Sequence, residues 1–227
     1  MQPPLQRSRQ NPANHGRFIT FEGLDGCGKS THLGRLATVL SAQGIEVIST
    51  REPGGSMIGE RIRVLLLDSR TLGLAPLAEL ALMFASRAQH LSEVILPAVE
   101  RGAWVLCDRY TDSSEAYQGA GRELGVDTVL TLHRLLCNGL QPDLTILLDN
   151  EVADSVARAR RRNAAGVGAD ENRFEQENRA FFERVHQQFM AIAQREPQRV
   201  VTIDARRSKD VVHEDVVAAV RGRLLAE

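Results

Sequence analysis

Short apolar runs and longer amphipathic stretches alternate along this chain, and that alternation predicts a parallel sheet flanked by helices. Apolar runs bounded by turn residues predict five strands: Phe18 to Glu22, Glu46 to Thr50, Trp104 to Cys107, Leu144 to Leu148 and Val200 to Ile203. Apolar positions at helical spacing predict helices over Ser30 to Gln43, Met57 to Leu67, Pro76 to Arg101, Asp127 to Cys137, Glu151 to Asn163, Gln176 to Arg195 and Lys209 to Leu225. Ligands of such sheets bind at the carboxyl ends of the strands, so the residues after each strand are candidate site residues.

Composition agrees with one large α/β domain. The chain has 227 residues, 43% of them hydrophobic and 25% charged, which is enough for a substantial core over residues 17–227. Residues 1–16 are rich in Gln, Pro, Asn and Arg, and they predict a disordered tail.

Charge and cysteine usage exclude several classes of protein. A net charge of -1 gives no general attraction to nucleic acid or anionic lipid, and no apolar run approaches the roughly 18 residues of a membrane span, so we expect neither partner. Cys27, Cys107 and Cys137 are far apart, which argues against a disulfide framework or a zinc site and predicts a cytoplasmic protein.

The strongest motif follows the first predicted strand and has the spacing of a phosphate-binding loop. It is Gly23-Leu24-Asp25-Gly26-Cys27-Gly28-Lys29-Ser30-Thr31. Its glycines let backbone N–H groups surround a polyphosphate, Lys29 can reach the β and γ oxygens, and the Ser30 hydroxyl can hold Mg²⁺. The whole motif therefore predicts a site for a nucleoside triphosphate.

Cys27 lies inside this motif, near a predicted helix N-terminus and Lys29. Both neighbours favour a thiolate, so one hypothesis is a reactive thiol whose modification blocks polyphosphate entry. The alternative is a small apolar residue with its side chain turned away from the ligand.

Two arginines follow the second and third predicted strands. They are Arg51 in Thr50-Arg51-Glu52-Pro53-Gly54-Gly55 and Arg109 in Asp108-Arg109-Tyr110. An Asp-Arg pair alone is more often a structural ion pair. Beside a phosphate loop, however, two arginines favour bidentate recognition of a second, acceptor phosphate.

Four motifs, in this order, resemble those of thymidylate kinases. They are Phe21-Glu22 with the loop to Thr31, Arg51-Glu52-Pro53-Gly54-Gly55, Asp108-Arg109-Tyr110 through Ala116-Tyr117-Gln118-Gly119, and Asn172-Arg173-Phe174-Glu175. The similarity runs from about Phe18 to the C-terminal helix. It implies a P-loop nucleoside monophosphate kinase-like fold, with a five-stranded parallel sheet and helices on both faces. It also implies transfer of the γ-phosphate of ATP to dTMP with Mg²⁺, in dTTP synthesis, by an enzyme that is usually a homodimer.

The resemblance assigns roles at the phosphate end of the site. Asp25 matches an acidic residue near the acceptor phosphate, its Mg²⁺ or the sugar hydroxyl, and Arg51 and Arg109 match arginines that grip the dTMP phosphate. The implied catalytic residues are Lys29, Arg109, Arg173 and Asp25. The implied metal ligands are Ser30, Asp25 and Asp108.

The resemblance also assigns roles at the base end. Arg87 matches the arginine that reaches the thymine carbonyl. A stacking phenylalanine commonly lies four residues before that arginine, where this chain has Met83, with Phe84 one residue later. We favour Phe84 as the ring under thymine, with core packing as the alternative. Three further residues complete the implied pocket: Ser114 and Gln118 at the base edge, and Tyr117, whose ring crowds the position of a ribose 2′-OH.

An arginine-rich segment predicts a lid at about residues 158–175. Arg158-Ala-Arg160-Arg161-Arg162 leads into a glycine-containing stretch, as a mobile lid requires. A run of arginines alone is more often a solvated helix face. In the bacterial arrangement of the family, a loop without arginine is paired with lid arginines, and Gly26 leaves that loop position without one. Which lid arginine reaches the phosphates stays open, and Arg173 is the most securely matched.

Two other functions compete with that of a dTMP kinase. A different nucleoside or nucleotide kinase would share the loop and the Asp-Arg strand end, but Ala116-Tyr117-Gln118-Gly119 and Arg51-Glu52-Pro53 disfavour it. A nucleotide-binding switch or motor ATPase would leave the acceptor arginines unexplained, and the chain has no Asn-Lys-x-Asp guanine signature. No general base is expected, because a phosphate monoester with a second pKa of about 6 is already largely deprotonated.

Overall fold

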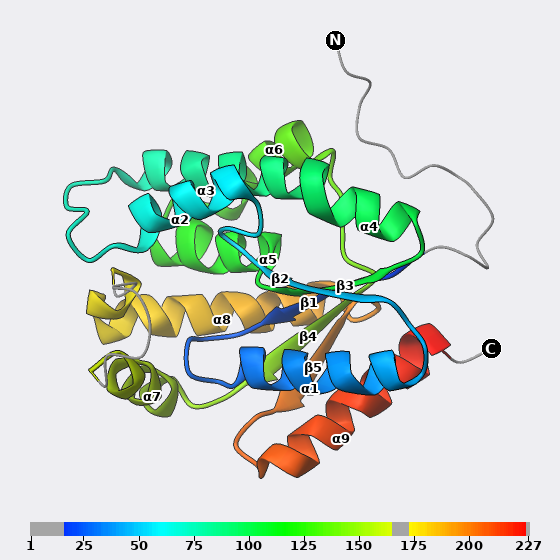
Figure 1. Ribbon diagram of the computed structural model, residues 1–227. Helices are drawn as coiled ribbons and strands as arrows, with labels where there is room; N and C mark the ends of the chain where they lie inside the picture. Colours follow the sequence, from blue (N-terminus) through cyan, green and yellow to red (C-terminus); the bar gives the residue numbers. More distant parts are fainter. Residues whose placement is uncertain (1–15, 165–172, 226–227) are drawn as a thin grey trace.

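Five parallel strands form the centre of the molecule in the order β2-β3-β1-β4-β5 (Figure 1). The structure is a computed structural model that describes residues 16–164 and 173–225, without the side chains of residues 162–164. The strands are β1 (Phe18–Glu22), β2 (Val47–Arg51), β3 (Trp104–Asp108), β4 (Leu144–Asp149) and β5 (Val200–Asp204). The sequence therefore located all five strands to within one residue at each end, and the predicted fold class is confirmed.

Helices cover both faces of the sheet (Figure 1). One face carries α1 (Lys29–Ala42) and α9 (Lys209–Val220). The other face carries α2 (Met57–Leu67), α3 (Pro76–His90), α4 (Leu96–Glu100), α6 (Val126–Cys137) and α8 (Arg179–Arg195). The two-residue periodicity of a strand explains this layering. Ile19 and Phe21 pack on the α1 and α9 side, whereas Phe18 packs on the opposite side.

The predicted helix from Pro76 to Arg101 is interrupted in the structure. Between α3 and α4 lies a π-helical turn, Leu91–Ile95, in which the Leu96 N–H donates to the Leu91 carbonyl, five residues back. Pro97 follows directly and has no N–H with which to continue the α-helical pattern. A π turn next to a proline is a common way to absorb such an interruption.

The other helical boundaries differ for local reasons. The helix that was predicted to begin at Gln176 begins at Arg179 as α8. Before it, Phe174–Gln176 form a short 3₁₀ turn. Asn178 sets this start, because its Oδ1 accepts from the Phe181 N–H at 2.9 Å as an N-cap. The last predicted helix is α9 as far as Val220 and then a π turn, Arg221–Leu225.

One helical segment was missing from the sequence-based prediction. Residues 111–121, which we call the substrate segment, form α5 (Thr111–Ser114) and the π turn η3 (Glu115–Gly121). The pattern could not show them, because the buried side chains of this segment are mostly polar. They include Thr111, Asp112, Ser113, Ser114, Glu115 and Gln118. A polar segment that is buried gives no apolar stripe.

The ends of the chain and part of the predicted lid lie outside the described residues. These are residues 1–15 of the predicted tail and 165–172 of the lid. Gly16, assigned to the tail, belongs to the body instead, since its N–H donates to the Val99 carbonyl at 3.1 Å. Cys27, Cys107 and Cys137 are all buried and free. No helix in the described part of the chain is long and apolar enough to cross a membrane.

Candidate active site

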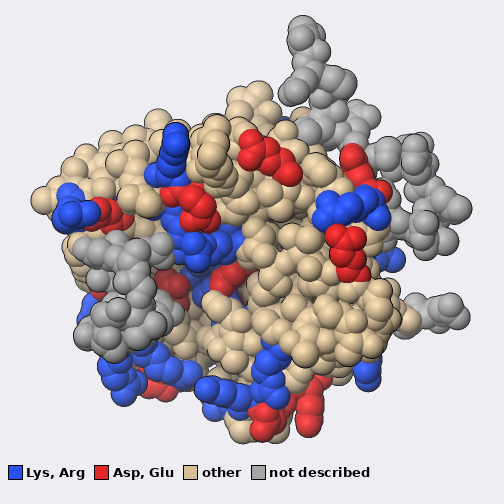
Figure 2. Space-filling model, viewed as in Figure 1, with Lys and Arg blue, Asp and Glu red and all other residues tan. Residues whose placement is uncertain are grey.

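The strand register brings the predicted site residues to one edge of the sheet. Asp108, at the end of β3, is paired with Phe21 of β1 and with Arg51 of β2. A pocket of about 780 Å³ opens there, a size typical of small-molecule sites. In Figure 2, basic and acidic side chains meet in the hollow between the α2–α3 layer and α7 (Val152–Ala164).

The donor loop, residues 23–31, is shaped mainly by backbone. Gly23, Gly26 and Gly28 have φ values of 129°, 86° and 103°, which side chains other than glycine rarely adopt. The Lys29 ammonium lies inside the loop and donates to the carbonyls of Gly23 at 3.1 Å and Leu24 at 2.9 Å. The loop therefore places a cation beneath backbone N–H groups that can surround a phosphate.

Gly26 is also required by its neighbour α7. A Cβ at this position would lie 2.4 Å from the Ser155 carbonyl oxygen and 3.1 Å from the Ala159 nitrogen. No side chain fits there without displacing the helix. The same contact brings α7 and its Arg158 over the donor loop, since the added Cβ would lie 3.1 Å from the Cβ of Arg158.

The structure favours the apolar-filler alternative for Cys27 over a reactive thiol. Cys27 is 3% exposed and packs with Ile19, Phe21 and Leu148 in the core cluster below the loop. Burial raises the pKa of its thiol, although nearby Lys29 acts in the opposite direction. Desolvation thus outweighs the lysine, and the alternative of a small apolar filler is the one that the structure supports.

Ser30 and Asp108 offer the oxygen ligands that Mg²⁺ prefers. The Ser30 hydroxyl donates to Asp108 Oδ2 at 2.8 Å, so that both side chains meet directly beside the loop. Mg²⁺ is usually held by one or two carboxylates together with substrate phosphates, and this pair fits that chemistry. Asp25, the third predicted metal ligand, accepts from Arg109 Nη2 at 2.8 Å and lines the same pocket.

Arg109 is held firmly at the centre of the acceptor side. Its backbone has a φ of 75°, which is unusual for a residue other than glycine, and such strained residues cluster at functional sites. Its guanidinium donates to Asp25 and to the Ser113 hydroxyl, each at 2.8 Å, and to the Tyr117 hydroxyl at 3.2 Å. Burial alone would lower the pKa of Arg109, but the negative charge of Asp25 keeps it well above its usual value.

Glu22, at the end of β1, fixes Arg109 from below. Its carboxyl group accepts from the Tyr110 N–H at 2.7 Å and lies 2.5 Å from the Ser113 hydroxyl. It thereby holds both the backbone next to Arg109 and the serine that Arg109 contacts. The resemblance gave Glu22 no role, and its only sequence signal is its place at a strand end.

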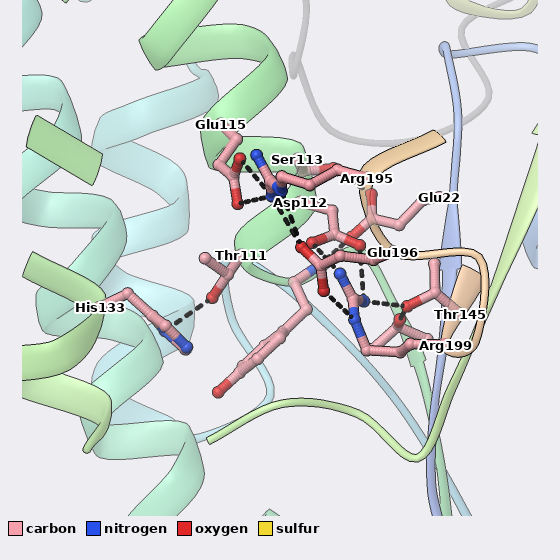
Figure 3. Close-up of polar contacts among 12 residues, drawn as sticks. Glu22, Thr111, Asp112, Ser113, Glu115, His133, Thr145, Arg195, Glu196 and Arg199 are labelled. Carbon is pink, nitrogen blue, oxygen red and sulfur yellow. Dashed lines mark hydrogen bonds and ion pairs between the residues drawn. The ribbon is translucent and has the colours of Figure 1, made fainter. Parts of the chain in front are cut away.

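A buried ionic network holds the substrate segment against the sheet (Figure 3). Arg199 Nη1 lies 2.8 Å from Asp112 Oδ2, and Arg195 Nη2 lies 2.9 Å from Glu115 Oε2. Both arginines come from the end of α8 and the chain that follows it, and Glu196 pairs with both. The Arg199–Asp112 pair is buried on both sides, so breaking it would leave an uncompensated charge and it strongly constrains the segment. The Arg195 side chain is 40% exposed, so its pair with Glu115 constrains the segment less.

Arg87 presents one free donor at the base end of the pocket. Its Nε lies 2.6 Å from Glu52 Oε2, and its Nη2 donates to the Tyr110 carbonyl and the Ser114 hydroxyl. Burial alone would raise the pKa of Glu52, but Arg87 and a hydrogen bond from His90 hold that pKa below its usual value. Arg87 Nη1 is buried and has no hydrogen-bond partner among the described residues.

Met83 lies on the pocket wall, whereas Phe84 does not. Phe84 is fully buried in the core, and its ring centroid lies 4.6 Å from the guanidinium carbon of Arg87. It therefore supports Arg87 from the core side. This position differs from the predicted one beneath thymine and matches the alternative of core packing.

The lid arginines occupy different positions. Arg158 lines the pocket, whereas Arg160 donates to the Glu175 carbonyl and Arg161 to the Ala157 carbonyl. The side chain of Arg162 lies outside the described residues. Arg173 does not line the pocket, because its Nη1 pairs with Glu79 Oε2 at 2.8 Å. Its catalytic assignment stays a prediction.

Most of the predicted site residues come together in this one pocket. Those that line it are Asp25, Gly26, Gly28, Lys29, Ser30, Thr31, Arg51, Arg87, Asp108, Arg109, Ser114, Tyr117, Gln118 and Arg158. Sequence reasoning gave no site role to nine others that line it: Glu52, Pro53, Arg63, Leu67, Tyr110, Ser113, Phe174, Glu175 and Lys209. Phe174 and Glu175 stand in the fourth motif, which was the available signal. Arg63 and Leu67 lie on an ordinary amphipathic helix and carry no such signal.

A parallel sheet with a phosphate-binding loop after β1, facing two arginines at the ends of neighbouring strands, defines a P-loop phosphotransferase of the nucleoside monophosphate kinase class. A family model described as thymidylate kinase matches residues 21–216. The chain belongs to the thymidylate kinase family.

Individual relatives agree with this assignment. A thymidylate kinase of Alkalilimnicola ehrlichii is 52% identical over 84% of this chain and 85% of its own length. One from Chromohalobacter salexigens is 50% identical over 92% of this chain and 97% of its own length. The crystal structure of thymidylate kinase from Ehrlichia chaffeensis is similar with a TM-score of 0.73 and 31% identity, covering 91% of this chain and 99% of that one.

Proposed function

We propose that this chain transfers the γ-phosphate of ATP to dTMP, giving dTDP, with ATP on the donor loop and dTMP between Arg109 and Arg87. The observation that carries the proposal is the single pocket that joins these groups. Its donor end has a loop lysine, its centre has a buried arginine, and its far end has a guanidinium N–H of Arg87 that no residue in the described part of the chain contacts by a hydrogen bond. The lysine suits a triphosphate, the buried arginine suits a monophosphate, and the guanidinium N–H suits a base carbonyl.

The protein contributes charge and alignment to this transfer. Two anionic nucleotides repel each other, and Lys29, Arg51, Arg109 and Arg158 supply the positive charge that offsets the repulsion. Bound Mg²⁺, with Ser30 and Asp108 as its protein contacts, would neutralise phosphate charge. Asp25 is engaged with Arg109, and we assign it to orienting that arginine at the acceptor phosphate.

Tyr117 and Met83 shape the acceptor pocket. The Tyr117 ring packs against Phe174 and Phe181, with its hydroxyl toward Arg109 and Asp25, so it is fixed at the sugar end. We propose that it excludes a ribose 2′-OH. Met83 gives the base an apolar wall.

A substrate panel tests the function directly. ADP formation is measured with dTMP, dUMP, dCMP and AMP as acceptors under MgATP. We expect dTMP to be best and dUMP to be poorer by about 10- to 200-fold in kcat/KM, because one methyl group discriminates by roughly 1–3 kcal/mol. Equal use of dTMP and dCMP would contradict the proposed thymine pocket.

We also propose that two copies associate through the layer formed by α2, α3 and α6. Large apolar side chains are exposed there, including Met57 at 72%, Val64 at 63% and Leu135 at 72%. Such a patch is typical of an association surface. Light scattering should give twice the chain mass, and Val64→Glu should give a monomer. A wild-type monomer at micromolar concentration would contradict this proposal. The predicted cytoplasmic location agrees with three free cysteines and stays a prediction.

A further inference from the structure

Glu79 of α3 is a fully buried carboxylate that does not line the pocket but contacts a residue that does. Gln118 Nε2 donates to Glu79 Oε1 at 2.9 Å. The second oxygen of Glu79 lies 2.8 Å from Arg173 Nη1 and 3.3 Å from Arg122 Nη2. Glu79 therefore lies between two arginines and the side-chain amide of Gln118.

This arrangement fixes which way the Gln118 amide faces. A carboxylate paired with two guanidinium groups accepts hydrogen bonds and donates none. Only the NH₂ end of the Gln118 amide can therefore face Glu79, which leaves the carbonyl oxygen as the end available to the pocket. The described residues supply no hydrogen bond to that oxygen, and Gln118 lines the pocket.

The base end of the pocket then has a definite polarity. Arg87 Nη1 is a buried donor without a partner among the described residues, and the Gln118 oxygen is an acceptor. Thymine presents a carbonyl oxygen at position 4 and an N–H at position 3, which match this pair. Cytosine presents an amino group at position 4 and a lone pair at position 3, so both contacts would be mismatched.

We infer that Glu79 is a specificity-determining positioning residue: by holding the NH₂ end of Gln118, it turns the amide oxygen toward the N3–H of a thymine base and against cytosine. The inference rests on the proposed function, because it assumes that dTMP occupies this end of the pocket. Glu79 touches no substrate and acts through Gln118. A purely structural role, neutralising Arg122 and Arg173, is the alternative.

Glu79→Gln separates these roles. Its amide oxygen can still face Arg173 Nη1 and Arg122 Nη2. Its NH₂ group, in the place of Oε1, loses the 3.3 Å contact from Arg122 Nε but can donate to Gln118, whose amide then turns and presents its own NH₂ to the pocket. The readout is the ratio of kcat/KM for dTMP to that for 5-methyl-dCMP, two nucleotides that differ only along the base edge at positions 3 and 4. We expect the ratio to fall by about 10- to 100-fold, since a hydrogen bond lost to a buried polar group has effects of this size.

Glu177→Gln is the matched control. Glu177 also pairs with Arg122, with Oε1 lying 2.5 Å from Arg122 Nη1, but it has no contact with Gln118. The ratio should stay at the wild-type value in this variant, and the KM for ATP should stay unchanged in both variants. An equal fall in the two variants would overturn the inference in favour of a structural role.

Glu79→Asp guards against loss of folding. It keeps the charge that the two arginines require and withdraws the carboxylate by one methylene from Gln118, so the ratio should again fall. A folded Glu79→Gln or Glu79→Asp variant with the wild-type ratio would overturn the inference. If wild-type protein does not prefer dTMP over 5-methyl-dCMP at all, it is the proposed function that fails.

The wild-type complex provides a test that needs no variant. The N3 proton of bound dTMP, labelled with ¹⁵N at N3, should give a persistent NMR signal shifted downfield by its hydrogen bond to Gln118. Rapid exchange of that proton with water in the saturated complex would overturn the inference, whether or not the Glu79 variants fold.

Discussion

The donor loop and the acceptor side of the pocket are built in different ways. The donor loop is one continuous segment, residues 23–31, whose shape comes from glycines and whose lysine bonds to carbonyls five and six residues away. The acceptor side is assembled from side chains far apart in the sequence: Arg109 contacts Asp25 across 84 residues, and Arg87 contacts Glu52 across 35. A site built from one continuous segment should tolerate substitutions elsewhere in the chain. A site assembled from distant side chains depends on every helix and strand that carries one of them.

The arginine that serves the transferring phosphate is the sharpest test of this contrast. Arg158 belongs to the donor side through the contact of α7 with Gly26, whereas Arg173 is bound to the acceptor side through Glu79. We expect Arg158→Ala to lower kcat by about 10³-fold or more, as for other arginines that stabilise phosphoryl transfer. Arg173→Ala should mainly raise the KM for dTMP and lower thermal stability. Steady-state kinetics of both variants decides, and a larger fall of kcat in Arg173→Ala would support the catalytic assignment made from the sequence.

Lys29→Ala should have the next largest effect. Its ammonium is the buried cation of the donor loop, and removing a comparable electrostatic contact costs on the order of 10²- to 10³-fold in kcat. The only other lysine of the chain, Lys209, also lines the pocket but is exposed, so Lys209→Ala is the matched control and should change kcat little. Circular dichroism should report a folded protein in both cases. Near-normal turnover of Lys29→Ala would refute the donor-loop assignment.

The same contrast explains what the sequence could predict. All strands and the donor loop were predictable, because apolar periodicity and glycine spacing are local signals. The helical form of the substrate segment and the roles of Glu22 and Glu79 were not. Their partners, Ser113 and Gln118, are 91 and 39 residues away, and no short-range pattern encodes such a pairing. Phe84 shows a subtler limit, since helical spacing placed it on the right helix but not on the pocket side of Arg87.

Arg109→Lys tests the distributed side. A lysine keeps the charge but cannot reproduce the fork of bonds to Asp25, Ser113 and Tyr117. We expect kcat/KM for dTMP to fall by about 10- to 100-fold, the range for losing charge-assisted hydrogen bonds, with the KM for ATP unchanged. Arg51→Lys should cost less, because the Arg51 side chain is 54% exposed. An equal fall of kcat/KM in the two variants would mean that the burial of Arg109 does not contribute to its role.

Stability should depend on pH through the acceptor side. Burial raises the pKa of Glu22 to about 8 and that of Glu115 to about 7. The folded protein then holds protons that the unfolded chain has released, so the free energy of unfolding falls as pH rises toward 8. The histidines with lowered pKa values, His32, His133 and His213, oppose this only below about pH 6.5.

Denaturant unfolding between pH 6.5 and pH 8 measures this effect without the histidines. Wild-type protein should lose on the order of 2 kcal/mol over that interval, because one pKa unit corresponds to about 1.4 kcal/mol. Glu22→Gln should lose most of the slope, whatever its absolute stability. A slope equal to that of wild type would show that Glu22 is already ionised at pH 6.5.

The smallest effect is expected at Cys27. A reactive thiol there would contradict the view that the donor loop is shaped by its backbone, because the loop would then depend on a side chain that the ligand displaces. Cys27 is as much a core residue as Cys107, which is fully buried at the end of β3, and burial raises the pKa of both thiols. Brief treatment of the folded protein with an alkylating reagent should label neither cysteine, with or without MgATP, whereas denatured protein should be labelled at both. Cys27→Ala should keep wild-type kcat to within about threefold, because a buried side chain of this size contributes packing and no phosphate contact. Selective labelling of Cys27 that MgATP suppresses would show that the loop opens far enough to expose its core side, and the donor loop would then be less self-contained than its backbone contacts indicate.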